Sequence, residues 1–292
     1  MTRTSRQDVC VCCLSPEVMR WFSKSVLGTD YPVCRCPDCG SAMVLPRPSQ
    51  KEMDAYYQAR DYGLASLEEA LLVDAGHYPD SQADADRIIP KLMRYAPGKR
   101  FMDVGAGVGF FSKVAMAKGL AVTALEPNPN SASAFAEQLG HGPLQQVLDE
   151  KTAEQFSHSQ DALLLSQVLE HICNVDDLLQ SLSCVLVSGG VVAVAVPHFG
   201  SLLSFLQGKR DMYISPPEHV NYFSIKGLNA LFERHGFQCL EIDTVTKVPR
   251  DKIVKSLPSS AGGLAWRGVY AGLKLTEWFG RGMIINAYYR KA

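Results

Sequence analysis

Three glycines that directly follow a short apolar segment are the first residues that suggest chemistry. Phe101–Val104 is typical of a buried strand, and Gly105, Gly107 and Gly109 come immediately after it. A helical apolar pattern then begins at Phe110. Glycine tolerates a positive φ and lets a ligand approach the backbone, while a helix N-terminus offers unpaired N–H groups. The stretch predicts a cradle for a polar or anionic small molecule; a simple tight turn is the alternative.

The spacing of the glycines and a later acid narrow the choice of ligand. A dinucleotide fold requires G-x-G-x-x-G, whose third glycine would stand where this chain has Phe110. Glu126 follows Gly109 by seventeen residues, at the end of the predicted strand Ala121–Leu125. An acid near that position in a doubly wound sheet reaches ribose hydroxyls. These features favour a nucleoside ligand that is not a dinucleotide, unless Glu126 is only a solvated acid at a strand end.

A second group of reactive residues lies near the N-terminus, where six of the nine cysteines fall within the first forty residues. Two C-x-x-C pairs stand 22 residues apart, close to the spacing of zinc ribbons. Four thiolates complete a tetrahedral shell, which predicts a structural zinc rather than a catalytic one. Cys12 and Cys34 are surplus and could replace a neighbour, and unliganded cysteines are the other alternative. The predicted ligands are Cys10, Cys13, Cys36 and Cys39.

Strand and helix patterns alternate through the rest of the chain. After the glycine loop, helices are expected at 110–118, 131–139, 176–186 and 224–235, and strands at 121–125, 144–148, 161–165, 191–196, 237–246 and 283–290. Such alternation predicts a doubly wound, Rossmann-like α/β sheet with helices on both faces. We divide the chain into a zinc-ribbon-like module at 1–48, a helical leader at 49–96 and the α/β domain at 97–292, with a helical insertion at 249–282.

The helical leader opens on a capping box. Ser49 and Glu52 have the S-x-x-E pattern, which predicts a helix running to about Tyr57, and Ser66 opens a second such pattern. Tyr56, Tyr57 and Tyr62 lie near these helices, where they are expected to pack or to contact a cofactor.

Bulk composition excludes several classes of protein. The formal charge is −1, which gives no general affinity for nucleic acid, and no apolar run is long enough to cross a membrane. The N-terminus lacks the apolar core of a secretion signal, so a cytoplasmic location is expected. From Lys247 to Ala292 nine basic residues face two acids. This excess predicts a solvated basic surface, a phosphate-bearing substrate or an acidic partner.

Together these motifs resemble a known family. DVGAGVGFF, LEPNP, DALLLSQVLEHI, SGGVVAVAVP and PPEHVNYFS occur in the order and spacing of class I S-adenosylmethionine-dependent methyltransferases. The likeness covers about residues 10–245 and is greatest to the branch that includes ubiquinone-biosynthesis and sugar methyltransferases. The double C-x-x-C resembles the zinc-ribbon leader of sugar C-methyltransferases. Those enzymes carry a further C-terminal domain that is not seen here, so the acceptor stays open.

The resemblance implies a seven-stranded sheet and a set of cofactor contacts. Asp103 and the three glycines would hold the amino acid portion of S-adenosylmethionine, and Glu126 the ribose. Asp149 or Glu150 would bond the adenine amino group, and Ser166 and Gln167 would lie beside the methyl donor.

Histidines at strand ends are candidates for a general base, because the ordinary imidazole pKa suits neutral pH. The candidates are His219, in the loop-rich segment where acceptor specificity is usually built, His198, and His171, for which a structural role at a helix start is the alternative. Tyr213, Tyr222 and Phe223 are expected to form walls of the acceptor site.

Three functions compete. The first is methylation of a small-molecule acceptor such as a sugar, polyketide or quinone-like metabolite, at oxygen or carbon. The second is methylation of RNA or protein, with the zinc module binding the substrate. The third is a non-catalytic scaffold that binds zinc and S-adenosylmethionine. For the insertion at 249–282, a lid, a homodimer contact, a membrane-surface helix and simple packing are all open.

Overall fold

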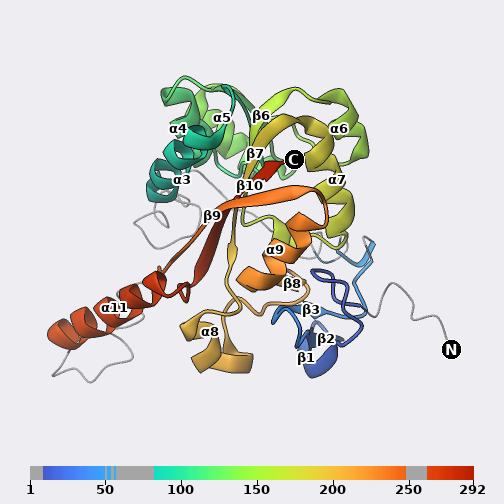
Figure 1. Ribbon diagram of the computed structural model, residues 1–292, viewed down its shortest axis with the longest axis vertical. Coiled ribbons are helices and arrows are strands. Elements are labelled where there is room, and N and C mark those ends of the chain that lie inside the picture. The colour runs from blue at the N-terminus through green and yellow to red at the C-terminus, as the bar shows by residue number, and fades with distance from the viewer. Residues whose placement is uncertain (1–8, 50, 54–55, 57–81, 248–261) are drawn as a thin grey trace.

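The computed structural model describes residues 9–49, 51–53, 56, 82–247 and 262–292. Its larger sheet has six strands in the order β5-β4-β6-β7-β10-β9 (Figure 1). Neighbours among β5, β4, β6 and β7 are parallel, whereas β10 pairs antiparallel with β7 and β9. The strands are β4 Arg100–Val104, β5 Ala121–Leu125, β6 Gln160–Ser166, β7 Leu186–Pro197, β9 Phe237–Val245 and β10 Ile284–Lys291.

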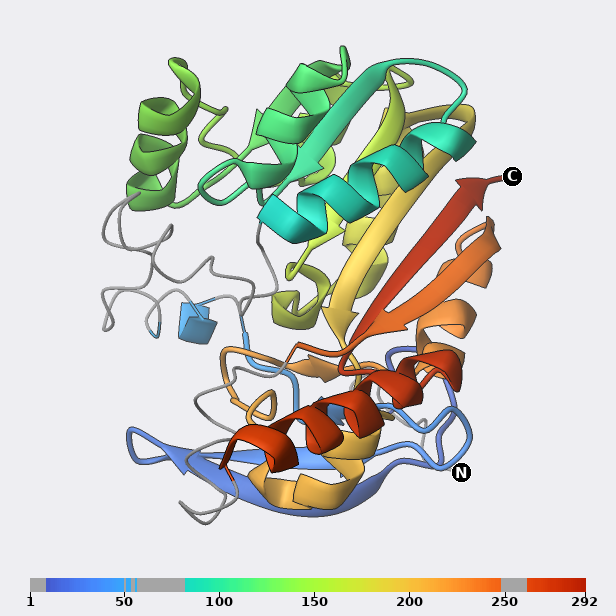
Figure 2. The ribbon, with the colours of Figure 1, turned by 90° about the vertical axis from the view of Figure 1, so that its left-hand side faces the viewer.

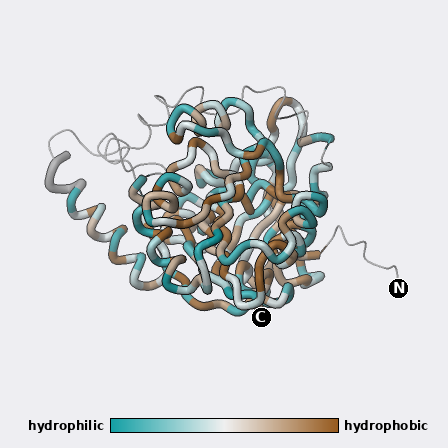
Figure 3. Tube along the Cα trace, turned by 90° about the horizontal axis from the view of Figure 1, so that it is seen from above, coloured by the Kyte–Doolittle hydropathy of each residue, from teal (hydrophilic) through white to brown (hydrophobic). Residues whose placement is uncertain are grey.

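Helices cover both faces of this sheet, as predicted (Figure 2). One face packs against α3 (Gln82–Tyr95) and α4 (Phe110–Ala117), and the other against α7 (Val175–Val185) and α9 (Ile225–Glu233). Residues 162–165 of β6 are all apolar because alternate side chains of this strand enter the cores on the two faces of the sheet. Hydrophobic residues are accordingly gathered between the outer layers (Figure 3). The remaining helices are α5 Pro129–Leu139, α6 Glu150–Gln155, α8 Leu202–Gln207 and α11 Gly262–Trp278, with short 3-10 turns η2 Leu169–His171 and η3 Gly208–Arg210.

The expected strand at 144–148 is reduced to one bridge. Leu144 pairs in parallel with Leu125 at the edge of the sheet, where the seventh strand would lie. Residues 145–147 are exposed, so there is no buried face that would reward further pairing. The described sheet therefore contains six strands and a single bridge.

The N-terminal segment forms its own small antiparallel sheet, which the α/β domain completes. Its order is β1-β2-β3-β8, and the last strand is contributed from far along the chain. The described N-terminal segment is thus joined by main-chain pairing to the residues just after His219. The strands are β1 Met19–Val26, β2 Thr29–Arg35, β3 Ala42–Val44 and β8 Asn221–Tyr222.

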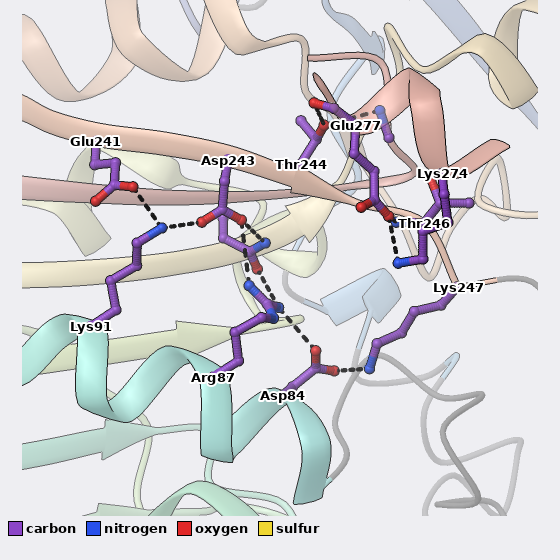
Figure 4. Close-up of polar contacts among 12 residues, drawn as sticks. Asp84, Arg87, Lys91, Glu241, Asp243, Thr244, Thr246, Lys247, Lys274 and Glu277 are labelled. Carbon is purple, nitrogen blue, oxygen red and sulfur yellow. Dashed lines mark hydrogen bonds and ion pairs between the residues drawn. The ribbon is translucent and has the colours of Figure 1, made fainter. Parts of the chain in front are cut away.

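A charged network ties α3 to the C-terminal elements (Figure 4). Lys91 pairs with both Glu241 and Asp243 on β9, and Lys247 pairs with the buried Asp84. Other basic residues after position 246 also have partners within the chain: Lys274 pairs with Glu277, and Arg281 and Lys291 donate to backbone carbonyls. Four of the nine basic residues from Lys247 onward thus have partners within the described part of the chain.

The leader and the insertion are described only in part. Ser49 and Glu52 form the predicted capping box, with Glu52 accepting from the Ser49 N–H at 2.7 Å. The expected features at Tyr57, Tyr62 and Ser66 lie outside the described residues. Of the insertion at 249–282, α11 occupies 262–278. Among the helices in the described ranges, none combines the length and the apolar character needed to cross a bilayer.

Candidate active site

The glycine loop connects β4 to α4 and is fixed to the neighbouring strand. The N–H groups of Gly105 and Ala106 both donate to the carbonyl of Leu125, at 2.8 and 2.9 Å. Glu126 continues this connection, because its carboxylate accepts from the N–H of Gly107 and from that of Asn128, each at 2.8 Å. Burial raises the pKa of Glu126 above its ordinary value. Glu126 therefore lies directly against the glycine loop.

The three glycines differ in what surrounds them. A Cβ at Gly105 would lie 2.6 Å from the Val168 side chain, and one at Gly109 would lie 2.7 Å from Phe135. At Gly107, with φ +56°, a Cβ would meet nothing within 4 Å. Gly105 and Gly109 are thus required by protein packing, and Gly107 is the glycine beside open space that a ligand can enter.

Asp103 lies beneath the loop rather than beside that space. Its carboxylate is 2% exposed and accepts the Ser112 hydroxyl of α4 at 2.7 Å. Burial raises the pKa of Asp103 to about 7. The Asp103 side chain therefore links β4 to α4, the two elements that the glycine loop connects.

This buried carboxyl predicts a pH dependence of stability. Because its pKa is raised in the folded protein, the stability it contributes is fully present below about pH 4 and is lost as the pH rises to about 7. Across that window the wild-type protein should lose stability on the order of 4 kcal/mol through this group, and the Asp103→Asn variant should not show that loss. Denaturant titrations of both proteins from pH 4 to 8 would measure it, and parallel curves would contradict it.

The loops after β5 and β6, with the start of α6, supply further predicted contacts. Gln167 follows β6 with a positive φ of 53°, and its N–H donates to Ala195 at 2.9 Å. Ser166 is the buried last residue of β6. Asp149 caps α6, and the Thr152 N–H that it accepts holds the pKa of Asp149 below its ordinary value. A cavity of about 1090 Å³ is lined by Asp149, Pro127 and His171 among others.

Two of the three predicted histidines lie in contact. The rings of His171 and His219 are 4.7 Å apart between centroids and 79° apart in plane. Nδ1 of His171 lies 2.9 Å from the carbonyl of Glu218, and Nδ1 of His219 lies 2.7 Å from that of Tyr213. A carbonyl only accepts, so each Nδ1 carries the proton and each Nε2 keeps a lone pair. Burial lowers the pKa of each to about 4, which keeps both rings neutral at pH 7.

His198 does not join this pair. It is 4% exposed, its Nδ1 bonds the carbonyl of Gly282 at 2.9 Å, and burial lowers its pKa to about 4. Of the predicted wall residues, Tyr213 stacks on His219, and the hydroxyl of Tyr222 donates to the His219 carbonyl at 2.7 Å. Phe223 is fully buried in the core, so it contacts protein rather than open space.

The sequence did not point to Arg47, which holds the two histidine-bearing segments together. Its guanidinium donates to the carbonyls of Ile172 and Cys173, directly after His171, and to that of Val220, directly after His219. All of these bonds lie between 2.8 and 3.1 Å. An arginine between two prolines gives no local indication of this contact.

The four predicted zinc ligands converge. Of the two surplus cysteines, the Cys12 thiol borders those of Cys10 and Cys39 without belonging to the group of four, and Cys34 is not part of it. Ligand atoms of Cys10, Cys13, Cys36 and Cys39 all lie within 4.8 Å of one another. The Cys10–Cys39 and Cys13–Cys36 sulfur distances are 3.5 and 3.6 Å. Zinc–sulfur bonds of about 2.3 Å in a tetrahedron place sulfurs about 3.8 Å apart, so the cluster fits zinc.

Comparison with known proteins identifies the family. Residues 80–242 match the family model described as a methyltransferase domain. The C-methyltransferase NovU of Streptomyces niveus is 24% identical over 199 residues, which are 64% of this chain and 46% of that protein. The match thus spans less than half the length of this relative.

Solved structures show the same fold. A 1,6-didemethyltoxoflavin-N1-methyltransferase from Burkholderia thailandensis, solved with S-adenosylhomocysteine, is 14% identical with a TM-score of 0.51, covering 92% of this chain and 98% of its own. A SAM-dependent methyltransferase from Archaeoglobus fulgidus is 15% identical with a TM-score of 0.51, covering 71% and 94%. The family match covers more than half of the chain and agrees with the strand order and the glycine loop. The chain therefore belongs to the methyltransferase domain family and has the class I S-adenosylmethionine-dependent methyltransferase fold.

Proposed function

We propose that this protein transfers a methyl group from S-adenosylmethionine to a small-molecule acceptor, such as a sugar, polyketide or quinone-like metabolite, at oxygen or carbon. One observation carries the proposal. One cavity is lined by Pro127, next to Glu126, by Asp149 and Glu150 at the start of α6, and by His171 of the histidine pair. A nucleoside would bind at the first two of these places. A cofactor and an acceptor bound there would be neighbours.

The chain has the groups needed to hold the cofactor. Gly107 leaves room at the loop, and Glu126 keeps lone pairs for ribose hydroxyls beyond the two N–H groups it accepts. Asp149 lines the cavity at the start of α6, where a carboxylate can accept from an adenine amino group. When bound, S-adenosylmethionine supplies an activated methyl group, so the protein has mainly to position and desolvate the acceptor.

On the acceptor side, His171 and His219 each offer an Nε2 lone pair. His171 lines the cavity, and the ring of His219 packs against that of His171. Either nitrogen can accept a hydrogen bond or a proton from an acceptor hydroxyl. We therefore assign the pair to the acceptor, and place His198 in a supporting role beside Tyr213 and Tyr222.

Calorimetry with S-adenosylmethionine tests the cofactor half of the proposal. Gly107→Ala would place a methyl group in the space where the ligand must approach, and we expect it to weaken binding at least about tenfold. Gly119→Ala is the matched control, because Gly119 also has a positive φ and open surroundings but ends α4 away from the loop. Equal affinity in the two variants would exclude the loop as the binding site.

Methyl transfer from labelled S-adenosylmethionine into a size-fractionated cell extract tests the acceptor half. Label in the small-molecule fraction is expected; label only in RNA or protein would favour the second function, and cofactor binding without transfer would favour the scaffold. His219→Ala should then reduce turnover at least about tenfold. His141→Ala, at an exposed position after α5, should leave turnover unchanged. Normal turnover in the His219 variant would remove this residue from the site.

The cluster of four cysteines supports a structural zinc as a second bound group. None of the nine cysteines, all of which lie in the described residues, forms a disulfide, which fits the reducing cytoplasm that we propose as the location.

A further inference from the structure

A second group of potential metal ligands includes the histidine pair. It lies far from the cysteine cluster in the sequence. Ligand atoms of Glu170, His171 and His219 all lie within 4.8 Å of one another. We propose that these three side chains bind a divalent transition-metal ion beside the acceptor cavity. This inference rests on the proposed function for its purpose, but the metal binding itself can be tested without any acceptor.

The hydrogen bonds of the two imidazoles are those of metal ligands. A metal-bound histidine typically donates its other ring N–H to a backbone carbonyl or carboxylate, which fixes the tautomer and the ring orientation. Here Nδ1 of His171 and of His219 each face a backbone carbonyl, at 2.9 and 2.7 Å. Within the described part of the chain, neither Nε2 has a protein hydrogen-bond partner. Both Nε2 lone pairs are thus available to a cation.

The backbone around the cluster is held rigidly enough to keep such a geometry. Asn221 donates through one amide nitrogen to the carbonyls of Leu169 and Ile172, both at 2.9 Å, and thereby fixes the turn η2 on which Glu170 and His171 lie. The Val220 N–H donates to the Glu170 carbonyl at 2.8 Å. These contacts link the two ligand-bearing segments directly.

Charge and access also favour a cation. Glu170 is 1% exposed and can contribute a carboxylate oxygen. Beside them, the cavity that His171 lines carries four acids and one lysine: Asp149, Glu150, Glu154 and Asp177 against Lys151. The local field therefore attracts cations, and the cavity provides the entry path.

The donor set indicates the kind of metal and its use. Two imidazoles and one carboxylate suit Zn²⁺, Mn²⁺, Fe²⁺ or Co²⁺ better than Mg²⁺ or Ca²⁺, which prefer oxygen ligands. Three protein ligands leave at least one position open, as in catalytic rather than structural sites. An acceptor hydroxyl in that position would lose its proton more readily, and the imidazoles would then act as ligands rather than as bases.

Mn²⁺ is a suitable probe because, unlike Zn²⁺, it competes poorly for four thiolates. Full-length protein with its cysteine cluster loaded with zinc would be titrated with Mn²⁺ alone, and free Mn²⁺ followed by electron paramagnetic resonance. We expect one Mn²⁺ bound per chain, weakened at least tenfold in Glu170→Gln and in His219→Asn. Glu137→Gln, which removes an exposed acid of α5 that does not line the cavity, should bind Mn²⁺ within threefold of wild type.

A second measurement does not depend on the variants folding. In the wild-type protein, the bound Mn²⁺ should show electron spin-echo modulation from imidazole nitrogen. Absence of stoichiometric Mn²⁺ binding, absence of the nitrogen modulation, or unchanged binding in both ligand variants would each overturn the proposal. Metal binding without methyl transfer would support this site and count against the proposed function, whereas methyl transfer by protein that binds no Mn²⁺ would do the reverse.

Discussion

Replacing Arg47 by alanine is expected to reduce acceptor turnover at least tenfold and to lower the free energy of unfolding by about 3 kcal/mol. The guanidinium bonds three carbonyls that follow His171 and His219 in the chain, and alanine would leave them without this donor. The two histidine-bearing segments would then lose the side chain that hydrogen-bonds to both of them. Among the described residues no hydrogen bond joins Arg47 to the glycine loop, so the affinity for S-adenosylmethionine should stay within about twofold.

Arg47→Lys separates the charge from the geometry of the guanidinium. Lysine keeps the positive charge but cannot reach carbonyls on two segments with one ammonium group, so stability should recover in part while turnover stays low. Steady-state kinetics, denaturant titration and calorimetry on the same three proteins would measure these effects. If turnover in the alanine variant were normal, or if cofactor affinity fell as far as turnover, Arg47 would not be a positioning residue for the acceptor side.

Local patterns in the sequence were sufficient to predict the glycine loop and the acid beside it. The glycine spacing, the apolar strand before it and the acid after the next strand are all short-range features, and the structure places Glu126 against Gly107. The convergence of the four cysteines was also predictable, because a C-x-x-C turn brings its own two sulfurs together. What the local sequence could not predict is that the two turns come together, since this depends on the fold. The 22-residue spacing agrees with the β1–β2 hairpin that lies between them.

The site that we propose for the acceptor was less predictable, because its geometry depends on contacts between distant segments. The pairing of β3 with β8 joins Ala42 to Tyr222, and nothing near either residue in the sequence indicates it. Arg47 reaches carbonyls about 125 and 173 positions away. Phe223 was one of the three expected wall residues, yet its side chain packs in the main core, whereas that of Tyr222, the preceding residue, packs in a different cluster. Residue type was enough to identify candidate side chains in this region. Which of them lie together depends on contacts between distant segments.

Removing the metal from the cysteine cluster should disable the acceptor side before the cofactor side. Three of the four cysteines are less than 5% exposed and belong to the same core cluster as Phe223 and Phe232 of the α/β domain. Arg234 donates to the carbonyls of Val11 and Cys12, and Ser224 donates to that of Cys39. The two C-x-x-C turns are therefore attached to α9 and to the residues around β8, which begins two positions after His219.

Cys36→Ser is the variant with the largest expected effect. The protein should retain no zinc at the cluster, and the free energy of unfolding should fall by at least about 5 kcal/mol, since binding energy at a structural zinc site is folding energy. Cys34→Ala is the matched control, because Cys34 lies on β2 and is not one of the four converging ligands. It should retain one zinc per chain at this site and near-normal stability.

The order in which acceptor turnover and cofactor binding are lost as zinc is removed distinguishes a role in positioning from general unfolding. At a chelator concentration that removes zinc from half of the molecules, acceptor turnover should be halved, while calorimetry with S-adenosylmethionine still finds close to one site per chain. The reason is that the glycine loop is fixed by β4, β5 and α4, whereas the segment after His219 is fixed by β3 of the small N-terminal sheet. Cofactor binding that disappears together with the zinc would mean that the module supports the whole fold. Turnover that survives zinc loss would mean that β8 and His219 keep their places without the module.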